Sequence, residues 1–303
     1  MRNPTPPPKF GTVENGKYVW KQGKPLPRYY KNGEDFISIY LPQNRVGVHN
    51  FYGGDDEKFF EKNLKEQPNN WKYRNKEVTY TLNSYGYRSR EFNTYDWSES
   101  IVLMGCSCTF GVGVSDEETL AYYLQQLTGR EVINLGTPGG SNQFILDQSI
   151  VMKKKYGTPF ALIMMWTVPD RLPHYGDDGV YHIGVWDSSE NGTHKHAKKF
   201  KSLFDNTYED DANEYIPLRN IVNTNRLIWE DKTKYTELSF FEQTSHYAEL
   251  PDFIPFSNTA RDLLHPGSSD FEETAKTLIK QINEKYGEDC LLSRKVGHNI
   301  KLL

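Results

Sequence analysis

The sequence of 303 residues lacks the charge and the long apolar segments that mark two large classes of protein. Its formal net charge is only −4 and its isoelectric point is about 6.1, so no overall positive field draws it to nucleic acid or to an acidic membrane surface. Its longest strongly apolar run, from Phe160 to Trp166, is far too short to cross a bilayer. We therefore expect no nucleic-acid partner and no insertion into a membrane.

Cysteine is scarce, and no secretory leader is evident. Two of the three cysteines, Cys106 and Cys108, are only two positions apart, and such close neighbours rarely meet disulfide geometry. We expect all three to be free thiols, made in a reducing compartment. The first residues are polar and rich in proline, without the apolar core of a signal peptide. We therefore expect synthesis in a cytoplasm, and a place of action either there or, for a phage-encoded chain, in the virion.

Clusters of metal ligands are missing as well. Four histidines occur in the polar stretch after residue 171, without Asp, Glu or Cys at ligand spacing: His174, His182, His194 and His196. We expect these side chains to be solvated on the surface. The sequence therefore predicts neither a metal site nor an organic cofactor.

The sequence does have the composition of a folded protein, with 37% hydrophobic, 25% charged and 14% aromatic residues. Proline, glycine and asparagine clusters, together with changes in periodicity, divide it into predicted parts. These are an irregular, strand-containing extension over residues 1–97, a main domain formed by 98–170 and 258–289, an insertion over 171–257, and a tail over 290–303.

The main domain shows the alternation of strands and helices that is typical of a parallel α/β sheet. Three short apolar runs predict strands buried on both faces: Ile101–Gly105, Val132–Leu135 and Phe160–Trp166. Helical spacing of apolar residues predicts helices after a capping box at Ser115 and from Ser141. A last helix is expected from about Ser269, capped by Ser269 and Glu272. We predict a three-layer α/β/α domain with a parallel sheet of about five strands.

The most informative segment is the glycine-rich turn from Gly105 to Gly113. It places Ser107 directly after a buried strand, at the carboxyl edge of the sheet, where open α/β folds bind their ligands. The glycines allow the backbone to turn sharply and to approach a substrate closely. Ser107 is therefore the candidate nucleophile. Cys106 or Cys108 stays an alternative, because thiolates are intrinsically stronger nucleophiles.

Two further segments supply partners for this serine. Asp262 and His265 are three residues apart in a predicted turn. At this spacing the carboxylate can hold the imidazole in one tautomer while its other nitrogen faces the serine. The loop after the second strand carries Gly139 and Asn142, whose backbone and side-chain amides suit an oxyanion.

Together these segments resemble the SGNH/GDSL hydrolase family. The turn around Ser107 is similar to the family's first block, usually written Gly-Asp-Ser, and Gly139 matches the glycine of the second block. Asp262-Leu-Leu-His265 matches the terminal Asp-x-x-His block. Upstream, Asn83–Arg88 is similar to a segment found in a phage-rich and bacterial subset of the family.

The resemblance covers about residues 79–170 and 258–286. It implies a flavodoxin-like fold in which the backbone amide of Gly139 helps to stabilise the oxyanion. It also implies hydrolysis of small acyl groups, with O-acetyl on a glycan as the leading substrate.

Two positions depart from the family pattern. Cys106 stands in place of the usual Asp, whose side chain is not the nucleophile. The third block, normally Gly-x-Asn-Asp, falls at residues 166–171, where no Asn occurs. One oxyanion donor is therefore missing or supplied elsewhere, and Asn142 and Thr167 are the nearest candidates. Loss of one such donor typically lowers the rate by about 10²–10³-fold.

The sequence thus predicts a serine ester hydrolase that acts on an acylated glycan or a small ester. A second hypothesis is a structural or adsorption protein of a phage particle, which keeps the fold with little or no turnover and works as a homo-oligomer or within the particle. A third is an O-acyltransferase on the same scaffold, which passes the acyl group to a sugar.

Overall fold

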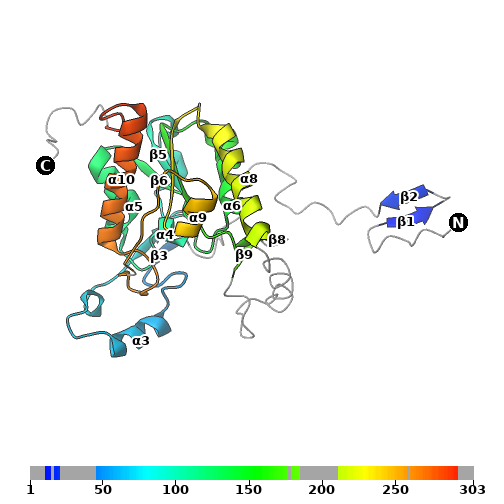
Figure 1. Cartoon of the computed structure of the whole chain (residues 1–303). Helices are drawn as coiled ribbons and strands as arrows, with labels where there is room; N and C mark the ends of the chain where they lie inside the picture. Colours follow the sequence, from blue (N-terminus) through cyan, green and yellow to red (C-terminus); the bar gives the residue numbers. More distant parts are fainter. Residues whose placement is uncertain are drawn as a thin grey trace.

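The computed structural model describes residues 11–14, 17–20, 46–176, 179–184, 211–257 and 259–292. At the centre lies a fully parallel sheet (Figure 1). Its strands lie in the order β10 (Lys234–Ser239), β7 (Ala161–Trp166), β5 (Ile101–Met104) and β6 (Val132–Asn134). The chain moves from β5 to one neighbour, β6, and then crosses back to the other, β7. This reversal creates a topological switch point at the carboxyl ends of β5 and β7, where such folds bind ligands.

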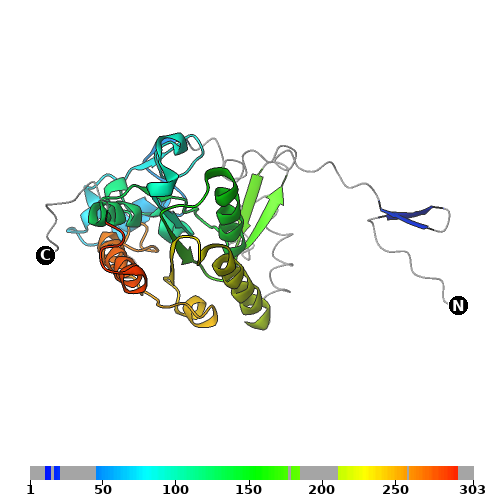
Figure 2. The same ribbon diagram turned by 90° about the horizontal axis from the view of Figure 1, so that it is seen from above.

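Two helices cover each face of the sheet. On one face lie α5 (Leu120–Thr128) and α10 (Ser268–Tyr286), and on the other α6 (Asn142–Tyr156) and α8 (Asp211–Trp229). Seen from above, the orange-red α10 and the olive α8 lie on opposite sides of the molecule (Figure 2). The predicted three-layer α/β/α architecture is therefore confirmed.

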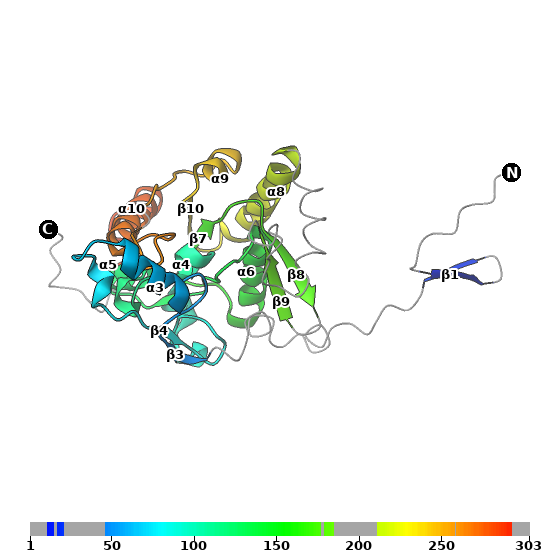
Figure 3. The same cartoon turned by 90° about the horizontal axis from the view of Figure 1, so that it is seen from below.

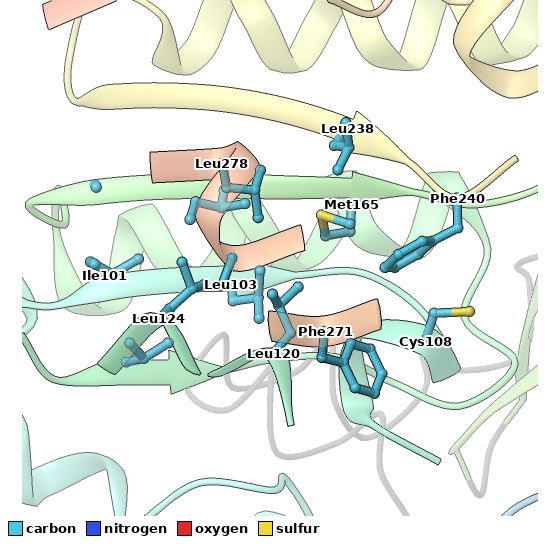
Figure 4. Packing of buried hydrophobic residues seen from close by; sticks show 14 of the residues in the cluster. Ile101, Leu103, Cys108, Leu120, Leu124, Met165, Leu238, Phe240, Phe271 and Leu278 are labelled. Atoms are coloured by element: carbon cyan, nitrogen blue, oxygen red, sulfur yellow. The ribbon is translucent and has the colours of Figure 1, made fainter. Parts of the chain in front are cut away.

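The strands are apolar because both faces of the sheet are covered. Every residue of β5 and β7 is buried. On the face of α5 and α10, Leu120 and Phe271 pack in one cluster with Leu103 of β5 (Figure 4). Removal of this apolar surface from water is the main force that holds the layers together.

The helices on either side of β6 begin where capping side chains stand. Ser115 and Glu118 form the predicted capping box, which opens a 3₁₀ turn, and Thr119 then caps α5. The Ser141 side chain accepts a hydrogen bond from the backbone N–H of Phe144 and so caps α6. Each cap satisfies a backbone donor that the first turn of a helix leaves unpaired.

The start of α10 differs from the prediction. Ser269 lies inside the first turn, and the capping residue is Gly267. Its backbone N–H donates to Oδ2 of Asp270 over 2.8 Å, so Asp270 takes the part that we assigned to Glu272. The reason is tertiary: a Cβ on Gly267 would lie 3.1 Å from the carbonyl carbon of Thr259, so only glycine fits where the chain enters the helix.

The sheet has four strands within the described residues, one fewer than predicted. Beside β10, where a fifth strand would lie, a single parallel bridge joins Ser239 to Phe253. Pro251 and Pro255 flank this bridge, and proline has no N–H to donate to a ladder. The chain therefore passes the edge of the sheet without extending it.

The predicted insertion over 171–257 is too long, because α8 and β10 belong to the main domain. Both elements are rich in polar residues, so their sequences do not show the apolar pattern of a buried helix or strand. Glu237 lies in the middle of β10 and is only 5% exposed. Its Oε2 accepts hydrogen bonds from Nε1 of Trp166 over 3.0 Å and from the hydroxyl of Tyr235 over 2.8 Å, and Arg226 pairs with its Oε1. These partners offset the cost of burying a carboxylate in a strand.

The predicted N-terminal extension is partly helical, although we expected strands and turns there. Helix α3 (Glu57–Glu66) begins after Asp56, whose side chain accepts from the backbone N–H of Phe59 over 2.8 Å. Strands β3 (Gly47–His49) and β4 (Tyr80–Leu82) pair in an antiparallel fashion on either side of it in the sequence. Figures 1 and 3 place α3 at the same end of the molecule as α4 (Ser107–Phe110), the short helix that follows β5.

The remaining elements are short. They are the hairpins β1 (Gly11–Glu14) with β2 (Lys17–Trp20) and β8 (Leu172–Gly176) with β9 (Gly179–Ile183), the helices α4 (Ser107–Phe110) and α9 (Glu242–Tyr247), and the 3₁₀ turns Lys72–Arg74, Phe92–Thr94, Trp97–Glu99 and Asp116–Glu118. In the part of the chain that the structure describes, no helix combines the length and the apolar character needed to span a bilayer.

Candidate active site

Ser107 is the first residue of α4 and lies three residues beyond the end of β5. This is the carboxyl edge of the sheet, beside the switch point between β5 and β7. The residue is 8% exposed, so its hydroxyl is largely shielded from water. The short helix follows from the sequence around it, because a buried strand ends here in a turn that only glycine permits.

Two glycines make this turn possible. A Cβ on Gly105 would lie 2.8 Å from the carbonyl oxygen of Met165 and would collide with the side chain of Thr109. Gly111 ends α4 in the left-handed region, with φ of 85°, and its N–H donates to the Ser107 carbonyl over 3.0 Å. The backbone around Ser107 is therefore fixed by residues within four positions of it and by its neighbour strand.

Ser107, His265 and Asp262 form one hydrogen-bonded row. Nε2 of His265 lies 2.8 Å from Oγ of Ser107, and Nδ1 lies 2.5 Å from Oδ2 of Asp262. The Asp262 side chain is fully buried and the imidazole is 15% exposed. The carboxylate holds a proton on Nδ1, which leaves the lone pair of Nε2 facing the hydroxyl. This arrangement can take the hydroxyl proton while the oxygen attacks a carbonyl carbon.

The turn between the acid and the base is partly held by the acid itself. Oδ1 of Asp262 accepts from the backbone N–H groups of Leu264 and His265, over 3.1 and 3.3 Å. Leu263, the residue after Asp262, has a φ of 60°, which is a strained value for a leucine. Strain of this kind persists only where the surrounding structure holds the chain.

The loop after β6 carries Gly139 next to the site. Its base is fixed because the N–H of Thr137 donates to the carbonyl of Gly105 over 3.0 Å, and Gly140 donates back to Thr137 over 2.9 Å. Gly139 has a φ of 76°, which favours glycine. Among the described residues, the backbone N–H groups of Ser107 and Gly139 donate to no acceptor. Both are therefore available to a negatively charged oxygen.

The structure gives Asn142 a different part from the predicted one. Its Nδ2 donates to the carbonyls of Thr167 and Val168, over 2.9 and 3.3 Å, and its Oδ1 accepts from the N–H of Thr167 over 2.9 Å. Both N–H bonds of the amide are thus in use, which corrects the expectation that Asn142 is an oxyanion donor. The residue instead ties the start of α6 to the backbone that follows β7.

Thr167 stands where the third block would supply its Asn. It is fully buried, and its carbonyl also accepts from the hydroxyl of Thr244 over 3.1 Å. Its own hydroxyl, Oγ1, has no oxygen or nitrogen partner within the described residues, but, besides the hydrogen bond with Cys108, a hydrogen bond from this side chain contributes to the lowered pKa of the Cys106 thiol. Of the two predicted substitutes, Thr167 is therefore the one with a side-chain donor to offer.

The segment Asn83–Arg88 supports the turn that follows α4, a role that its sequence did not reveal. The Arg88 side chain is 3% exposed and pairs with Asp116 over 2.7 Å. Its guanidinium also donates to the carbonyls of Gly111 and Val114, over 2.6 and 2.8 Å. Five fixed donors on one planar group make arginine suited to satisfying several carbonyls of a loop at once.

Cys106 and Cys108 flank Ser107 but lie in the apolar core. Each is 3% exposed, and both belong to the cluster on the α5 and α10 face (Figure 4 shows Cys108). A hydrogen bond to Cys106 and burial together raise the pKa of the Cys108 thiol. The same hydrogen bond lowers the pKa of the Cys106 thiol. In the described structure the base, His265, hydrogen-bonds to Ser107 and to neither thiol.

The described residues contain no group of three or more His, Cys, Asp or Glu side chains placed to hold a metal ion. His194 and His196 lie outside the described residues. His182, in β9, is not the solvated side chain that we expected, since both of its ring nitrogens are buried. Burial lowers the pKa of His182 to about 4, because the charged form would lose its hydration.

The solved structures described here are similar to this chain at a sequence identity of 11–13%. No protein-family model matches it, and no curated protein matches its sequence. Among solved structures, an acetyl xylan esterase from the rumen bacterium Butyrivibrio proteoclasticus is 12% identical, with a TM-score of 0.37, and the match covers 63% of this chain and 64% of that one. A psychrotrophic esterase from Pseudoalteromonas sp., inhibited by monoethylphosphonate, is 11% identical, with a TM-score of 0.36 and coverage of 62% and 98%.

A third solved structure is a protein of the G-D-S-L family from Desulfitobacterium hafniense DCB-2, described as lipolytic. It is 13% identical, with a TM-score of 0.29 and coverage of 61% of this chain and 74% of that one. At identities this low and TM-scores below 0.5, these structures do not assign an activity to this chain. An assignment has to come from the geometry of its own side chains.

Proposed function

We propose that this chain is a serine ester hydrolase, with Ser107 as nucleophile and His265, oriented by Asp262, as general base. One observation carries the proposal: the 2.8 Å contact from Ser107 Oγ to His265 Nε2, continued by the 2.5 Å contact from Nδ1 to the buried carboxylate. A serine beside a histidine is common in proteins. A buried carboxylate on the far ring nitrogen is what distinguishes an arrangement for acyl transfer.

The proposed reaction proceeds through an acyl-enzyme. His265 Nε2 takes the Ser107 proton as Oγ bonds to the acyl carbon, and the imidazolium is stabilised by Asp262. The carbonyl oxygen becomes an oxyanion, which accepts hydrogen bonds from the backbone N–H groups of Ser107 and Gly139. His265 then protonates the leaving alcohol. Water, deprotonated by His265, releases the carboxylic acid and restores Ser107.

We assign the third oxyanion donor to the hydroxyl of Thr167. The support is twofold: this hydroxyl is buried without an oxygen or nitrogen partner among the described residues, and the amide of Asn142 is already engaged. A hydroxyl can rotate to donate to an oxyanion when one forms. Asn142 then contributes by fixing the backbone of Thr167.

The proposed substrate is a small acyl ester, with O-acetyl on a glycan as the leading candidate from the family resemblance. A turn of the N-terminal segment lies next to the base. A Cβ on Gly54 would lie 3.9 Å from Cε1 of His265, and one on Gly53 would lie 3.5 Å from Cβ of Pro138. The turn of residues 53–54 is therefore close both to the base and to the loop that carries Gly139.

Two rivals remain to be separated from hydrolysis. A structural or adsorption protein of a phage particle, acting as an oligomer or within the particle, would keep the fold and lack turnover. The missing third-block Asn and the engaged amide of Asn142 favour this rival. An O-acyltransferase would share the acyl-enzyme but pass the acyl group to a sugar.

Labelling of the serine by a fluorophosphonate probe, read by peptide mass spectrometry, tests the proposal. We expect the wild type to be labelled at Ser107 and Ser107→Ala to carry no label. His265→Ala should react about 10²–10⁴-fold more slowly, which is the usual contribution of a general base. Cys106→Ala serves as the control and should retain the label, because its thiol lies outside the hydrogen-bonded row.

A folded wild type that carries no label at Ser107 would remove the support for a hydrolase and leave the structural protein as the function to pursue. If Ser107 is labelled, competition between water and a sugar for the acyl group of an activated acetyl ester separates hydrolase from transferase. Release of acetate without an acetylated sugar is the expected result.

A further inference from the structure

Arg261, the residue before Asp262, contacts a part of the chain that is distant in the sequence. The side chain of Arg261 is 3% exposed and pairs with Asp55, which is 1% exposed. Nε of Arg261 lies 3.0 and 3.1 Å from the two carboxylate oxygens, and Nη2 lies 2.6 Å from Oδ2. The rings of Phe51 and Phe60 lie over the guanidinium, 4.4 and 5.1 Å from its carbon. A planar guanidinium that donates to both oxygens of a carboxylate, with aromatic rings packed over it, is restricted to one geometry.

The backbone of Arg261 is held as firmly as its side chain. Its N–H donates to the carbonyl of Gly113 over 2.8 Å. Its carbonyl accepts from Nδ2 of Asn63, in α3, over 3.1 Å. Gly113 belongs to the turn that follows Ser107. The backbone of Arg261 therefore contacts both the nucleophile's turn and the N-terminal segment.

These contacts close into a ring. The hydroxyl of Tyr80 donates to Oδ2 of Asp55, and the same hydroxyl accepts from the N–H of Gly113 over 2.8 Å. The ring therefore runs from Asp55 through Tyr80 to Gly113, on through the backbone of Arg261, and back to Asp55. It joins the nucleophile's turn to the residue next to Asp262, with Asp55 as the acceptor that both sides share.

The ring lies directly beside the base. Gly54, the neighbour of Asp55, lies close to the pair Asp262 and His265, which we call the dyad. A Cβ on Gly54 would lie 3.9 Å from Oδ2 of Asp262 and 3.9 Å from Cε1 of His265. The turn that carries the dyad contains Leu263 in the left-handed region, so it depends on outside support. The ring provides such support, because it holds Arg261, which directly precedes Asp262.

We propose that Asp55 is a positioning residue for the reaction, which sets the contact between Ser107 and His265 through Arg261 and Gly113. The proposal rests on the proposed function. A displacement of about 1 Å between reacting groups can lower a rate about 10²-fold, even when the altered residue never touches the substrate. Binding of the substrate should change little, because Asp55 is only 1% exposed and its carboxylate is taken up by Arg261 and Tyr80.

The test measures the two constants of fluorophosphonate inactivation, the maximal rate kinact and the half-saturating concentration KI, together with thermal unfolding. For Asp55→Asn we expect kinact to fall by about 10²-fold, with KI changed by less than about twofold. Tyr80→Phe opens the ring but keeps the ion pair, so kinact should fall by a smaller factor, about tenfold or less. The matched control is Glu237→Gln, which breaks the buried ion pair with Arg226 of α8. It should lower the unfolding temperature and leave both constants unchanged.

The outcomes separate the two proposals. If the folded wild type is not labelled at all, the proposed function fails. If the wild type is labelled and folded Asp55→Asn reacts at the wild-type rate, the positioning role of Asp55 is overturned. An equal loss of kinact in Glu237→Gln also overturns it, because the effect would then be one of general stability. Should Asp55→Asn not fold, Tyr80→Phe decides: an unchanged kinact contradicts the proposal and a reduced kinact with constant KI supports it.

Discussion

The two halves of the Ser-His-Asp row are held in place by different means. Ser107 owes its position to residues that are close to it in the sequence: the strand before it, Gly105, and the left-handed Gly111 four residues later. The dyad of Asp262 and His265 is supported by residues about 150 to 206 positions away. A nucleophile on a local turn can be recognised from sequence, whereas the support of its base is a property of the assembled fold.

The difference follows from the elements that carry each half. Ser107 lies between a strand buried on both faces and a helix, and both are determined by local pattern. The dyad lies in a turn without flanking regular structure until α10 begins. A turn of this kind has few backbone partners of its own, so contacts with Asp55, Asn63 and Gly113 replace them.

The largest effect is expected where the two halves meet, in Gly113→Ala. Gly113 has a φ of 82°, which costs an alanine about 1–2 kcal/mol. A Cβ there would also lie 2.7 Å from Cβ of Ala260 and 3.0 Å from Oδ1 of Asp262, and overpacking adds about 1–3 kcal/mol. Denaturant unfolding should therefore show a loss of about 2–5 kcal/mol, and labelling of Ser107 should slow.

Gly157→Ala is the matched control for this prediction. Gly157 has nearly the same φ, 83°, but a Cβ there meets no atom within 4 Å. With a ψ of −150°, Gly157 lies in a backbone region that only glycine commonly adopts, so this variant shows the cost of such a conformation, about 1–3 kcal/mol, without the collision. Equal losses in the two variants would mean that the added methyl group meets no resistance, so that the two turns are packed less tightly than these distances indicate.

A somewhat smaller effect is expected on the local half alone, in Gly105→Ala. Its Cβ would lie 2.8 Å from the carbonyl oxygen of Met165 and would collide with the side chain of Thr109. The carbonyl belongs to a central strand and cannot move away cheaply, so we expect a loss of about 3 kcal/mol in unfolding free energy and little labelling of Ser107. A stable variant labelled at the wild-type rate would show that the tight turn is not what places the serine.

The smallest effect is expected from Gly54→Ala. The nearest atoms to its Cβ, in Asp262 and His265, lie at 3.9 Å, which is ordinary contact. We expect a change within about 0.5 kcal/mol in unfolding free energy, as for other exposed substitutions, and a labelling rate close to that of the wild type. Larger residues at this position should first slow the esters with longer acyl chains. A strong effect of alanine itself would place residue 54 closer to the substrate than its contacts indicate.

Much of the fold was open to prediction because it depends on local pattern. The strands β5, β6 and β7 are short apolar runs, and Ser141 caps α6 as expected. The Ser115 capping box forms too, but it opens a 3₁₀ turn, and Thr119 caps α5 after it. Strand β10 was missed because Glu237 interrupts its apolar character, and the partners that stabilise this carboxylate come from other elements. The described residues lack the expected fifth strand. Pro251 and Pro255 flank the single bridge beside β10, and which segment reaches that sheet edge is settled only by the tertiary fold.

The sequence by itself determined the nucleophile's turn and the strands β5, β6 and β7 of the parallel sheet, because strand burial, helix caps and glycine turns depend on neighbours along the chain. It also placed an acid and a base three residues apart. Only the tertiary structure decided what each polar group does. It engaged the amide of Asn142 with the backbone of Thr167, left the Thr167 hydroxyl without an oxygen or nitrogen partner among the described residues, and set Asp55 against Arg261. Such pairings depend on distances in space between residues far apart in the chain, and no local pattern encodes them.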